Sequence, residues 1–175
     1  RYHLTLIKLA IINNSTNNQV SILCKEYELY GFRINQNESN PDAMITYLAD
    51  NAEYEPAHMD FSKDIFNYGS WDTAFFIRKI KPCMLKKDGT VDYELDPNDF
   101  SKRKDNWLNS DISNESYEGN AMVGIPTAYV KFVKIDDNTA EYYISNKKID
   151  DDYNCFAHLD ANGNVMPYTY MPIYN

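Results

Sequence analysis

The strongest local signal in this sequence is an Asp-Gly pair, Asp88-Gly89, which separates two short apolar runs. The first run covers residues 82–85, and the second covers residues 91–95, where apolar and polar side chains alternate. An Asp-Gly pair in this setting is typical of a tight β-hairpin, because the turn needs positive φ angles at both central residues. We therefore predict an antiparallel hairpin over residues 82–95.

Other segments carry hairpin or turn signals of the same kind. Residues 128–135 and 141–144 lie on either side of an Asp-Asp-Asn turn, which predicts a second hairpin. An Asn-Gly pair at 162–163 predicts a third turn, before an extended segment. Near the start, a polar loop separates the apolar segments 3–12 and 20–24, so we expect a further hairpin there.

Two more segments have the composition of strands. Residues 26–34 alternate, and Gly31 within them indicates a bulge or a close approach of another group. Residues 73–80 are rich in aromatic and branched side chains, which favours a strand. Between these strands, residues 53–71 carry several aromatic side chains without a regular period. We expect this loop to pack onto a sheet.

One segment carries a helix start signal. Asn40, Pro41 and Asp42 have the order of a helix cap, a proline at the first helical position and an acid in the first turn. The apolar spacing that follows predicts a short helix to about Ala52. The β-formers at 45–47 leave a strand as the alternative.

The composition agrees with a β-rich chain. The sequence has 15 Tyr and 8 Phe residues together with many Asn and Asp residues, so strand formers alternate with turn formers. At 175 residues the chain has the length of one domain. We predict a mainly β fold, α+β at most, in which antiparallel hairpins are joined by long loops and one or two short helical turns.

The charge balance excludes two classes of partner. The formal net charge is −9, which argues against binding nucleic acid or an anionic membrane surface because both are negatively charged. Apolar runs fall far short of the roughly 20 residues that a membrane-spanning helix needs, so we expect no membrane insertion. The chain starts at Arg1 without a signal-peptide pattern, which indicates a segment of a longer polypeptide.

Side chains with catalytic or metal-binding chemistry are few and widely spaced. Cys24, Cys83 and Cys155 are odd in number and form no CxxC pair, so we expect free thiols rather than disulfides or a zinc site. The three histidines, His3, His58 and His158, are far apart in the sequence, and an HExxH motif is absent from it. Motifs for phosphate binding or serine hydrolysis are absent from the sequence. We identify no catalytic, cofactor-binding or metal-binding residue and expect no cofactor.

Two acidic segments, at residues 150–152 and 160–164, have oxygen ligands of the kind that Ca²⁺ prefers. The second segment departs from the order of an EF-hand loop and lacks its closing Glu. Solvated acidic loops and an Asn-Gly turn are the simpler interpretation of both segments.

The candidate ligand-binding residues are the two tryptophans, Trp71 and Trp107, which lie in loop-like segments. Trp107 has Asn106 and Asn109 nearby, and an exposed indole beside amides suits stacking on the apolar face of a sugar. The alternative is that both rings pin loops to the edge of the domain.

Several short segments between residues 26 and 175 have the pattern of one protein family. They are YGFRI (30–34), NP (40–41), ITY (45–47), KPCML (81–85), DGTV (88–91), LDPND (95–99), MVGIP (122–126) and EYYIS (141–145). These segments resemble tail-fibre or receptor-binding proteins of tailed bacteriophages of the gut-phage type. The LDPND and MVGIP segments are the most specific. The chain departs from the family pattern at Thr127-Ala128, where a Lys and an aromatic residue are usual.

The resemblance implies a structural and adhesion protein of the virion surface, on a tail fibre or baseplate, that contributes to host attachment and is not an enzyme. It further implies a homotrimer among other virion proteins, made in the host cytoplasm, with a host cell-surface glycan or protein as receptor. Residues 1–25, which the resemblance does not cover, are expected to form a connecting strand or linker. Residues 26–175 are expected to form a single β-rich fibre or adhesion domain, truncated at its C-terminal end, which leads into a distal part resembling a C-type lectin.

Two other functions stay open at this point. A carbohydrate-binding module of a prophage-derived surface protein would bind sugar as a monomer and would depend on Trp107. A glycan depolymerase would need a pair of acidic residues in a cleft beside Trp71 or Trp107.

Overall fold

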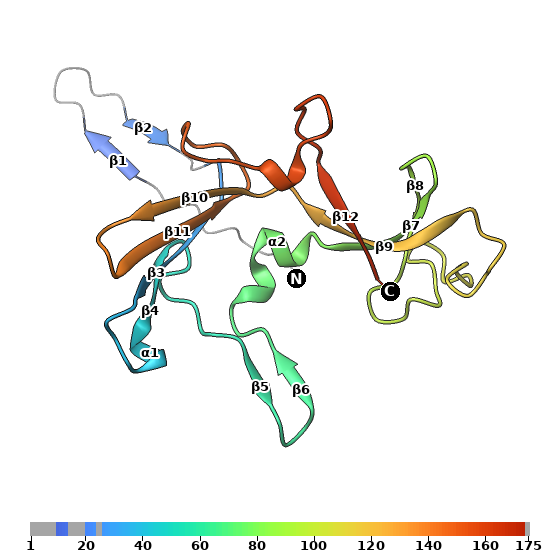
Figure 1. The fold of residues 1–175 in the computed structure, drawn as a ribbon, viewed down its shortest axis with the longest axis horizontal. Coiled ribbons are helices and arrows are strands. Elements are labelled where there is room, and N and C mark those ends of the chain that lie inside the picture. The colour runs from blue at the N-terminus through green and yellow to red at the C-terminus, as the bar shows by residue number, and fades with distance from the viewer. Residues whose placement is uncertain (1–9, 14–19, 24–25, 174–175) are drawn as a thin grey trace.

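The computed structural model describes residues 10–13, 20–23 and 26–173. Strands make up 41% and helices 9% of the structure, so the prediction of a mainly β fold with one or two short helical turns is confirmed. The described residues form two four-stranded sheets and two separate two-stranded hairpins, and every strand pair is antiparallel. The two larger sheets lie toward opposite ends of the molecule (Figure 1).

The first sheet has the strand order β10-β11-β3-β4. The predicted hairpin around the Asp-Asp-Asn turn is confirmed as β10 and β11, and β11 then pairs along its whole length with β3. This non-local pairing joins segments more than 100 residues apart in the sequence into one sheet. The strands are β3 (Leu29–Asn35), β4 (Ile45–Ala49), β10 (Tyr129–Lys134) and β11 (Thr139–Ser145).

The second sheet has the order β12-β9-β7-β8 and contains the predicted Asp-Gly hairpin as β7 and β8. Gly89 has a φ of +84°, whereas Asp88 stays outside the positive-φ region. The turn is therefore longer than the predicted two-residue type, and the amide of Lys86 donates to the carbonyl of Thr90 across it at 2.9 Å. The strands are β7 (Lys81–Lys86), β8 (Val91–Glu94), β9 (Gly119–Pro126) and β12 (Tyr168–Pro172).

A small aromatic core fixes the short helix α2 (Phe75–Arg78) against the first sheet. Tyr30, Ala74 and Phe75 are buried there. The ring of Tyr30 lies 6.1 Å from that of Phe75 and 5.3 Å from that of Phe76, centroid to centroid. Figure 1 shows α2 between the two sheets. Ala128, in the two-residue link from β9 to β10, packs against the same core, so this core lies at the junction of the two sheets.

The structure corrects two predictions of local structure. Within residues 73–80, the structure has the one-turn helix α2 at Phe75–Arg78 rather than a strand, because Ala74 and Phe75 turn into the core. The helix α1 (Pro41–Met44) has the predicted cap, in which the side chain of Asn40 accepts from the amide of Asp42, but it ends at Met44 rather than near residue 52. The alternative prediction of a strand at residues 45–47 is confirmed, since the residues after α1 form β4 and complete the edge of the first sheet.

The expectation that residues 53–71 pack onto a sheet is wrong for the middle of that segment. β5 (His58–Asp60) and β6 (Ile65–Asn67) form a separate hairpin, which projects from the body of the molecule (Figure 1). Its tip residue Phe61 is 88% exposed. Tyr54 and Trp71, at the two ends of the segment, do pack against the core.

The remaining predictions concern both ends of the chain. β1 (Ala10–Asn13) pairs with β2 (Val20–Leu23), which confirms the first hairpin, although much of the predicted linker 1–25 lies outside the described residues. The Asn-Gly turn is confirmed, and Gly163 has a φ of +82°. None of the helices in the described part of the chain is long and apolar enough to cross a membrane.

Candidate functional site

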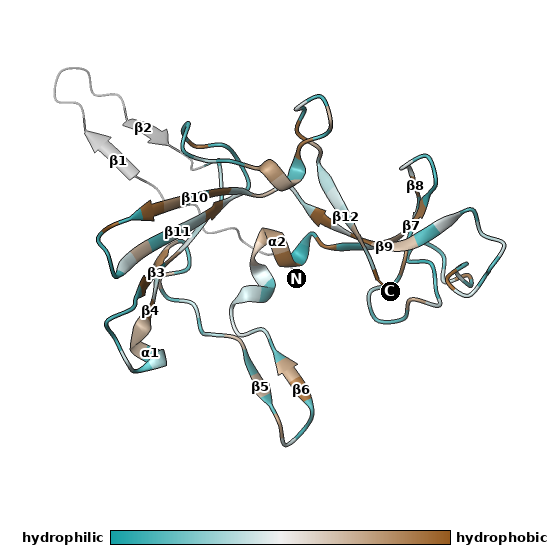
Figure 2. Cartoon of the chain, in the orientation of Figure 1, coloured by the Kyte–Doolittle hydropathy of each residue, from teal (hydrophilic) through white to brown (hydrophobic). Residues whose placement is uncertain are grey.

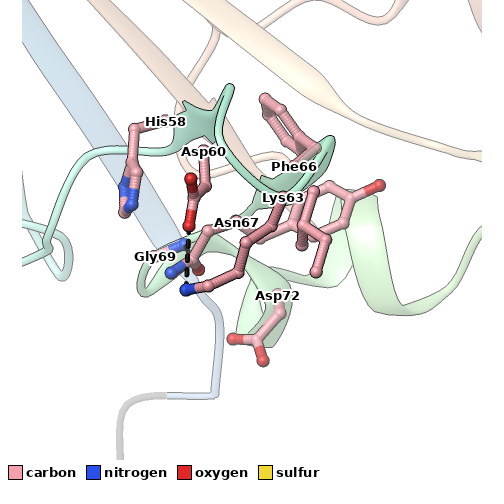
Figure 3. Close-up of a pocket in the computed structure, with 9 residues that line it drawn as sticks. His58, Asp60, Lys63, Phe66, Asn67, Gly69 and Asp72 are labelled. Atoms are coloured by element: carbon pink, nitrogen blue, oxygen red, sulfur yellow. Dashed lines mark hydrogen bonds and ion pairs between the residues drawn. The ribbon is translucent and has the colours of Figure 1, made fainter.

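An open pocket of about 360 Å³ lies along the β5–β6 hairpin and the segment that follows it. The hairpin contributes His58, Asp60 and Phe66, and the following segment contributes Tyr68 and Asp72. Figure 3 shows His58, Asp60, Phe66 and Asp72 around the pocket with Lys63, which extends across its front. The lining thus combines aromatic rings with acidic, basic and amide groups.

Some polar groups of this pocket are already paired. The carboxylate of Asp60 forms an ion pair with Lys63 at 3.0 Å and accepts bonds from the amide and hydroxyl of Ser62. The hydroxyl of Ser62 lowers the pKa of this carboxyl first, and Lys63 adds to the effect. Asp60 therefore stays ionised and opposite in charge to Lys63 at neutral pH.

Other polar groups of the pocket are available to a ligand. The side-chain oxygen of Asn67 accepts from the amide of Gly69 at 2.9 Å, and the NH₂ group of this exposed side chain donates to no other described residue. Within the described ranges, the side chains of His58 and Asp72 form neither a hydrogen bond nor an ion pair. A donor amide, an imidazole and a carboxylate acceptor thus border one cavity.

Two aromatic rings of the pocket are exposed. Phe66 is 52% and Tyr68 is 48% exposed, and their centroids lie 4.9 Å apart with the rings nearly perpendicular at 87°. An edge-to-face pair of this kind holds both rings in defined orientations. The rings therefore offer a rigid apolar surface next to the free polar groups.

The base of the hairpin is tightly packed. Gly69 has a φ of +60°, and a Cβ at this position would lie 2.5 Å from the carbonyl oxygen of Glu55. The amide of Glu55 donates to the hydroxyl of Ser70 at 3.0 Å, and the amide of Ser70 donates back to the carbonyl of Glu55 at 3.2 Å. These contacts join the segment after the hairpin to the segment before it, and so hold Gly69, which lines the pocket, in place.

A second notable surface is a row of aromatic side chains across the first sheet. Phe132, Tyr142, Phe32 and Tyr47 are direct cross-strand partners on β10, β11, β3 and β4. Tyr142 stacks on Phe32 at 5.1 Å and contacts Phe132 at 5.0 Å. Trp71 covers the Tyr47 end at 5.2 Å, but Phe132 at the other end is 57% exposed.

The uncovered part of this row continues along β10. Val130 lies two residues before Phe132 on the same face of the sheet, and it too is exposed. Figure 2 shows hydrophobic colouring over much of β10. We name Val130, Phe132 and Tyr142 the open apolar face.

Exposed apolar side chains outnumber buried ones in the described part of the chain. Eight apolar residues are buried, whereas sixteen large apolar side chains are exposed. Single exposed apolar residues are normal, but contiguous patches mark surfaces that meet another molecule. The open apolar face and the β5–β6 hairpin account for several of the sixteen.

The two tryptophans selected from the sequence occupy different environments. Trp71 is half-buried and packs edge-on against Tyr47 and Tyr54, with ring centroids 5.2 and 5.3 Å apart. This packing is the one expected from the alternative interpretation, in which the ring pins a loop to the edge of the domain. Trp71 directly precedes Asp72 of the pocket, but its own ring belongs to the core.

Trp107 matches the ligand-binding interpretation better. Its side chain is 63% exposed, and its backbone has a φ of +59°. The side chain of Asn106 accepts from the amide of Leu108 at 3.0 Å, which shapes the loop. The structure does not bring Trp107 together with Trp71. Trp71 begins a short 3-10 helix, Trp71–Thr73, whereas Trp107 lies in the long connection between β8 and β9.

The acidic segments are held by lysines and by their own backbone. Lys131 lies 3.1 Å from Asp150 and 2.8 Å from Asp152, and hydrogen bonds from these two carboxylates raise its pKa. Asp160 accepts from the amides of Asn162 and Asn164, as in a turn. Among the described residues, no group of three or more His, Cys, Asp or Glu side chains is arranged to hold a metal ion.

The buried thiols and the buried histidine have structural surroundings. Cys83 and Cys155 are free and buried, which confirms the prediction of free thiols for these two, and burial raises the pKa of Cys83. Cys24 lies outside the described residues. Burial lowers the pKa of His158, whose Nδ1 lies 2.9 Å from the hydroxyl of Thr169.

The pocket on the β5–β6 hairpin was not predicted from the sequence. A signal was present in the turn-forming run from Asp60 to Asp64 between two short segments that each contain an apolar residue. Because each strand has three residues, alternation in them is too short to be distinguished from a loop.

Comparisons of the chain with protein-family models, with curated proteins and with solved structures give no match. The resemblance to phage tail-fibre proteins therefore stays a prediction.

Proposed function

We propose that this chain is a structural and adhesion component of a phage virion, a tail-fibre or baseplate-associated receptor-binding protein that contributes to host-surface attachment. In this proposal it acts by assembly and binding rather than by catalysis. It forms a homotrimer on the virion surface next to other virion proteins. The resemblance of its short segments to the family and its β-rich fold support this proposal.

The observation that carries the proposal is the apolar surface that one copy leaves uncovered. The exposed large apolar side chains are twice as many as the buried apolar residues of the described part, sixteen against eight. Contact with other chains would remove this surface from water, and each square ångström buried contributes about 25 cal/mol. A chain that functions within an assembly would cover these apolar side chains against its neighbours.

The open apolar face is the surface that we assign to contact between copies. Aromatic residues are enriched in the buried centres of protein interfaces. Phe132 and Tyr142 already contact each other at 5.0 Å, so they would enter such an interface in fixed positions. Three copies that turn this face toward a shared threefold axis would cover it within one closed assembly.

The experiment has two parts. Light scattering measures the mass of residues 1–175 in solution, and an antibody raised against this chain is applied to candidate phage particles in the electron microscope. A trimer and a labelled tail or fibre would support the proposal. A monomer that labels no part of the particles would overturn it.

The exposure of Trp107 favours a second candidate function, that of a carbohydrate-binding module of a prophage-derived surface protein. Here the chain binds sugar as a monomer, and Trp107→Ala removes the binding. Release of reducing ends from a host capsule on incubation with the chain would instead favour a glycan depolymerase.

A further inference from the structure

We propose that the pocket on the β5–β6 hairpin is a binding site for a neutral saccharide of one or two sugar rings. The inference rests on the proposed adhesion function and names the class of receptor for it. It places recognition on Phe66, Asn67 and Asp72 rather than on Trp71 or Trp107.

The size and shape of the pocket set the scale of the ligand. Its volume of about 360 Å³ lies at the lower end of the range that holds small organic molecules. The pocket is open on one side and lies on a projecting hairpin (Figure 1), so a terminal sugar of a longer chain can enter without a channel.

The chemistry of the lining suits a sugar. A sugar ring presents C–H groups on its faces and hydroxyls around its edge, and so needs an apolar plane with hydrogen-bonding groups beside it. The exposed ring of Phe66 offers the plane. The NH₂ group of Asn67 can donate to a hydroxyl oxygen, and the carboxylate of Asp72 can accept from a hydroxyl group with the added strength of a charged acceptor.

The charge of the pocket selects against anionic ligands. Asp60 and Lys63 form an ion pair at 3.0 Å and so compensate each other. Asp72 has no such partner among the described residues, which leaves the site with a negative charge. A sialylated or uronic sugar, or a phosphate group, would be repelled, and the net charge of −9 acts in the same direction.

The pocket is preorganised, which lowers the entropic cost of binding. The Phe66–Tyr68 ring pair orders one wall, and the hydrogen bonds between Glu55 and Ser70 hold the segment that carries Gly69. The ion pair between Lys63 and Asp60 holds the side chain that extends across the front (Figure 3).

The test uses the full 175-residue chain and saturation-transfer NMR at millimolar sugar. The neutral probes are lactose, maltose, cellobiose and mannobiose, and the anionic probes are sialyllactose and a hyaluronan tetrasaccharide. We expect binding of at least one neutral probe and weaker binding of both anionic ones. Absence of binding by every neutral probe, or preference for an anionic one, would overturn the proposal.

Matched variants locate the site. Phe66→Ala and Asp72→Asn should each reduce affinity for the neutral probe by about tenfold, which is the loss expected for one good contact. Phe61→Ala should leave it unchanged, since Phe61 is also exposed on the hairpin but does not line the pocket. Because Phe66 and Asp72 lie outside the buried core, the variants are expected to fold. Loss of binding in Trp107→Ala with retention in Phe66→Ala would place the sugar elsewhere and overturn the proposal.

The test of this sugar site and the test of the proposed virion function can fail independently of each other. A trimer on labelled particles that binds no neutral probe would refute this site and leave the virion assignment standing. A monomer absent from particles that still loses sugar binding in Phe66→Ala would refute the virion assignment and leave the site standing.

Discussion

Asn51 holds the backbone of Gly31 through both of its polar groups. Its side-chain oxygen accepts from the amide of Gly31 at 2.7 Å, and its side-chain nitrogen donates to the carbonyl of Gly31 at 2.9 Å. Asn51 is fully buried and lies just beyond the end of β4, where Ala49 has a φ of +55°. The side chain of Asn51 thus satisfies both the N–H and the C=O of Gly31 within the buried interior.

Replacing this amide should be costly. In Asn51→Ala, the amide and the carbonyl of Gly31 both lose a buried partner, and each such loss costs about 1–3 kcal/mol. We expect the free energy of unfolding to fall by about 2–4 kcal/mol, measured by urea denaturation. Asn37→Ala is the control, because the side chain of Asn37 is exposed, and it should change stability little. Equal effects of the two variants would contradict the role of Asn51.

Gly69 and Gly163 allow a paired test of steric contact. Both have positive φ, at +60° and +82°. A Cβ on Gly163 meets no atom within 4 Å, whereas one on Gly69 would meet a backbone oxygen at 2.5 Å. Gly163→Ala should cost about 1–2 kcal/mol through backbone strain alone, and Gly69→Ala about 2–4 kcal/mol because overpacking adds to that strain. Thermal unfolding of both variants checks the difference, and a smaller loss for Gly69→Ala would contradict it.

Elements set by local turn chemistry could be predicted from the sequence. The hairpins β7–β8 and β10–β11 have their turn residues between the two paired strands, so a short window contains the whole signal. The cap of α1 is local for the same reason. In contrast, the pairing of β11 with β3 joins residues more than 100 positions apart in the chain, and no local pattern encodes it.

The wrong strand prediction and the missed pocket each have a physical cause. For the strand, burial decided between conformations of similar local preference. The run Phe75-Phe76-Ile77 has the composition of a strand, yet it forms one helical turn because Ala74 and Phe75 are buried at the junction of the sheets. The pocket could not be predicted because its hairpin turns through Asp64 at a φ of +54°. Asp tolerates this conformation but does not signal it as Gly does.

Glu141 should make stability depend on pH. Its carboxylate accepts from Arg33 at 2.5 Å and from the hydroxyl of Tyr143 at 2.8 Å, and Arg33 first, then Tyr143, lowers its pKa from the ordinary value of 4.5. Because the folded pKa is the lower one, this stabilisation is fully present above pH 4.5 and is lost as the pH falls through the folded pKa.

The variant Glu141→Gln should therefore be less stable than the parent at pH 7, and the gap should narrow below pH 4.5. Urea denaturation across this pH range measures the gap. Glu118→Gln is the control, because Glu118 is exposed and lies 3.3 Å from an exposed Lys87, so its profile should follow the parent. A gap for Glu141→Gln that is constant with pH would contradict the linkage.

Phe132→Lys tests whether the open apolar face joins copies of the chain. Phe132 is 57% exposed and contacts Tyr142 at 5.0 Å, so its loss should cost a single copy only about 0.5–1.5 kcal/mol. Within a contact between copies, the variant would bury an unpaired ammonium group, which is far more costly. We therefore expect light scattering to shift from the mass of a trimer to that of a monomer. Phe61→Lys, at the hairpin tip, should keep the trimer mass, and a trimer that persists in Phe132→Lys would assign the contact to another surface.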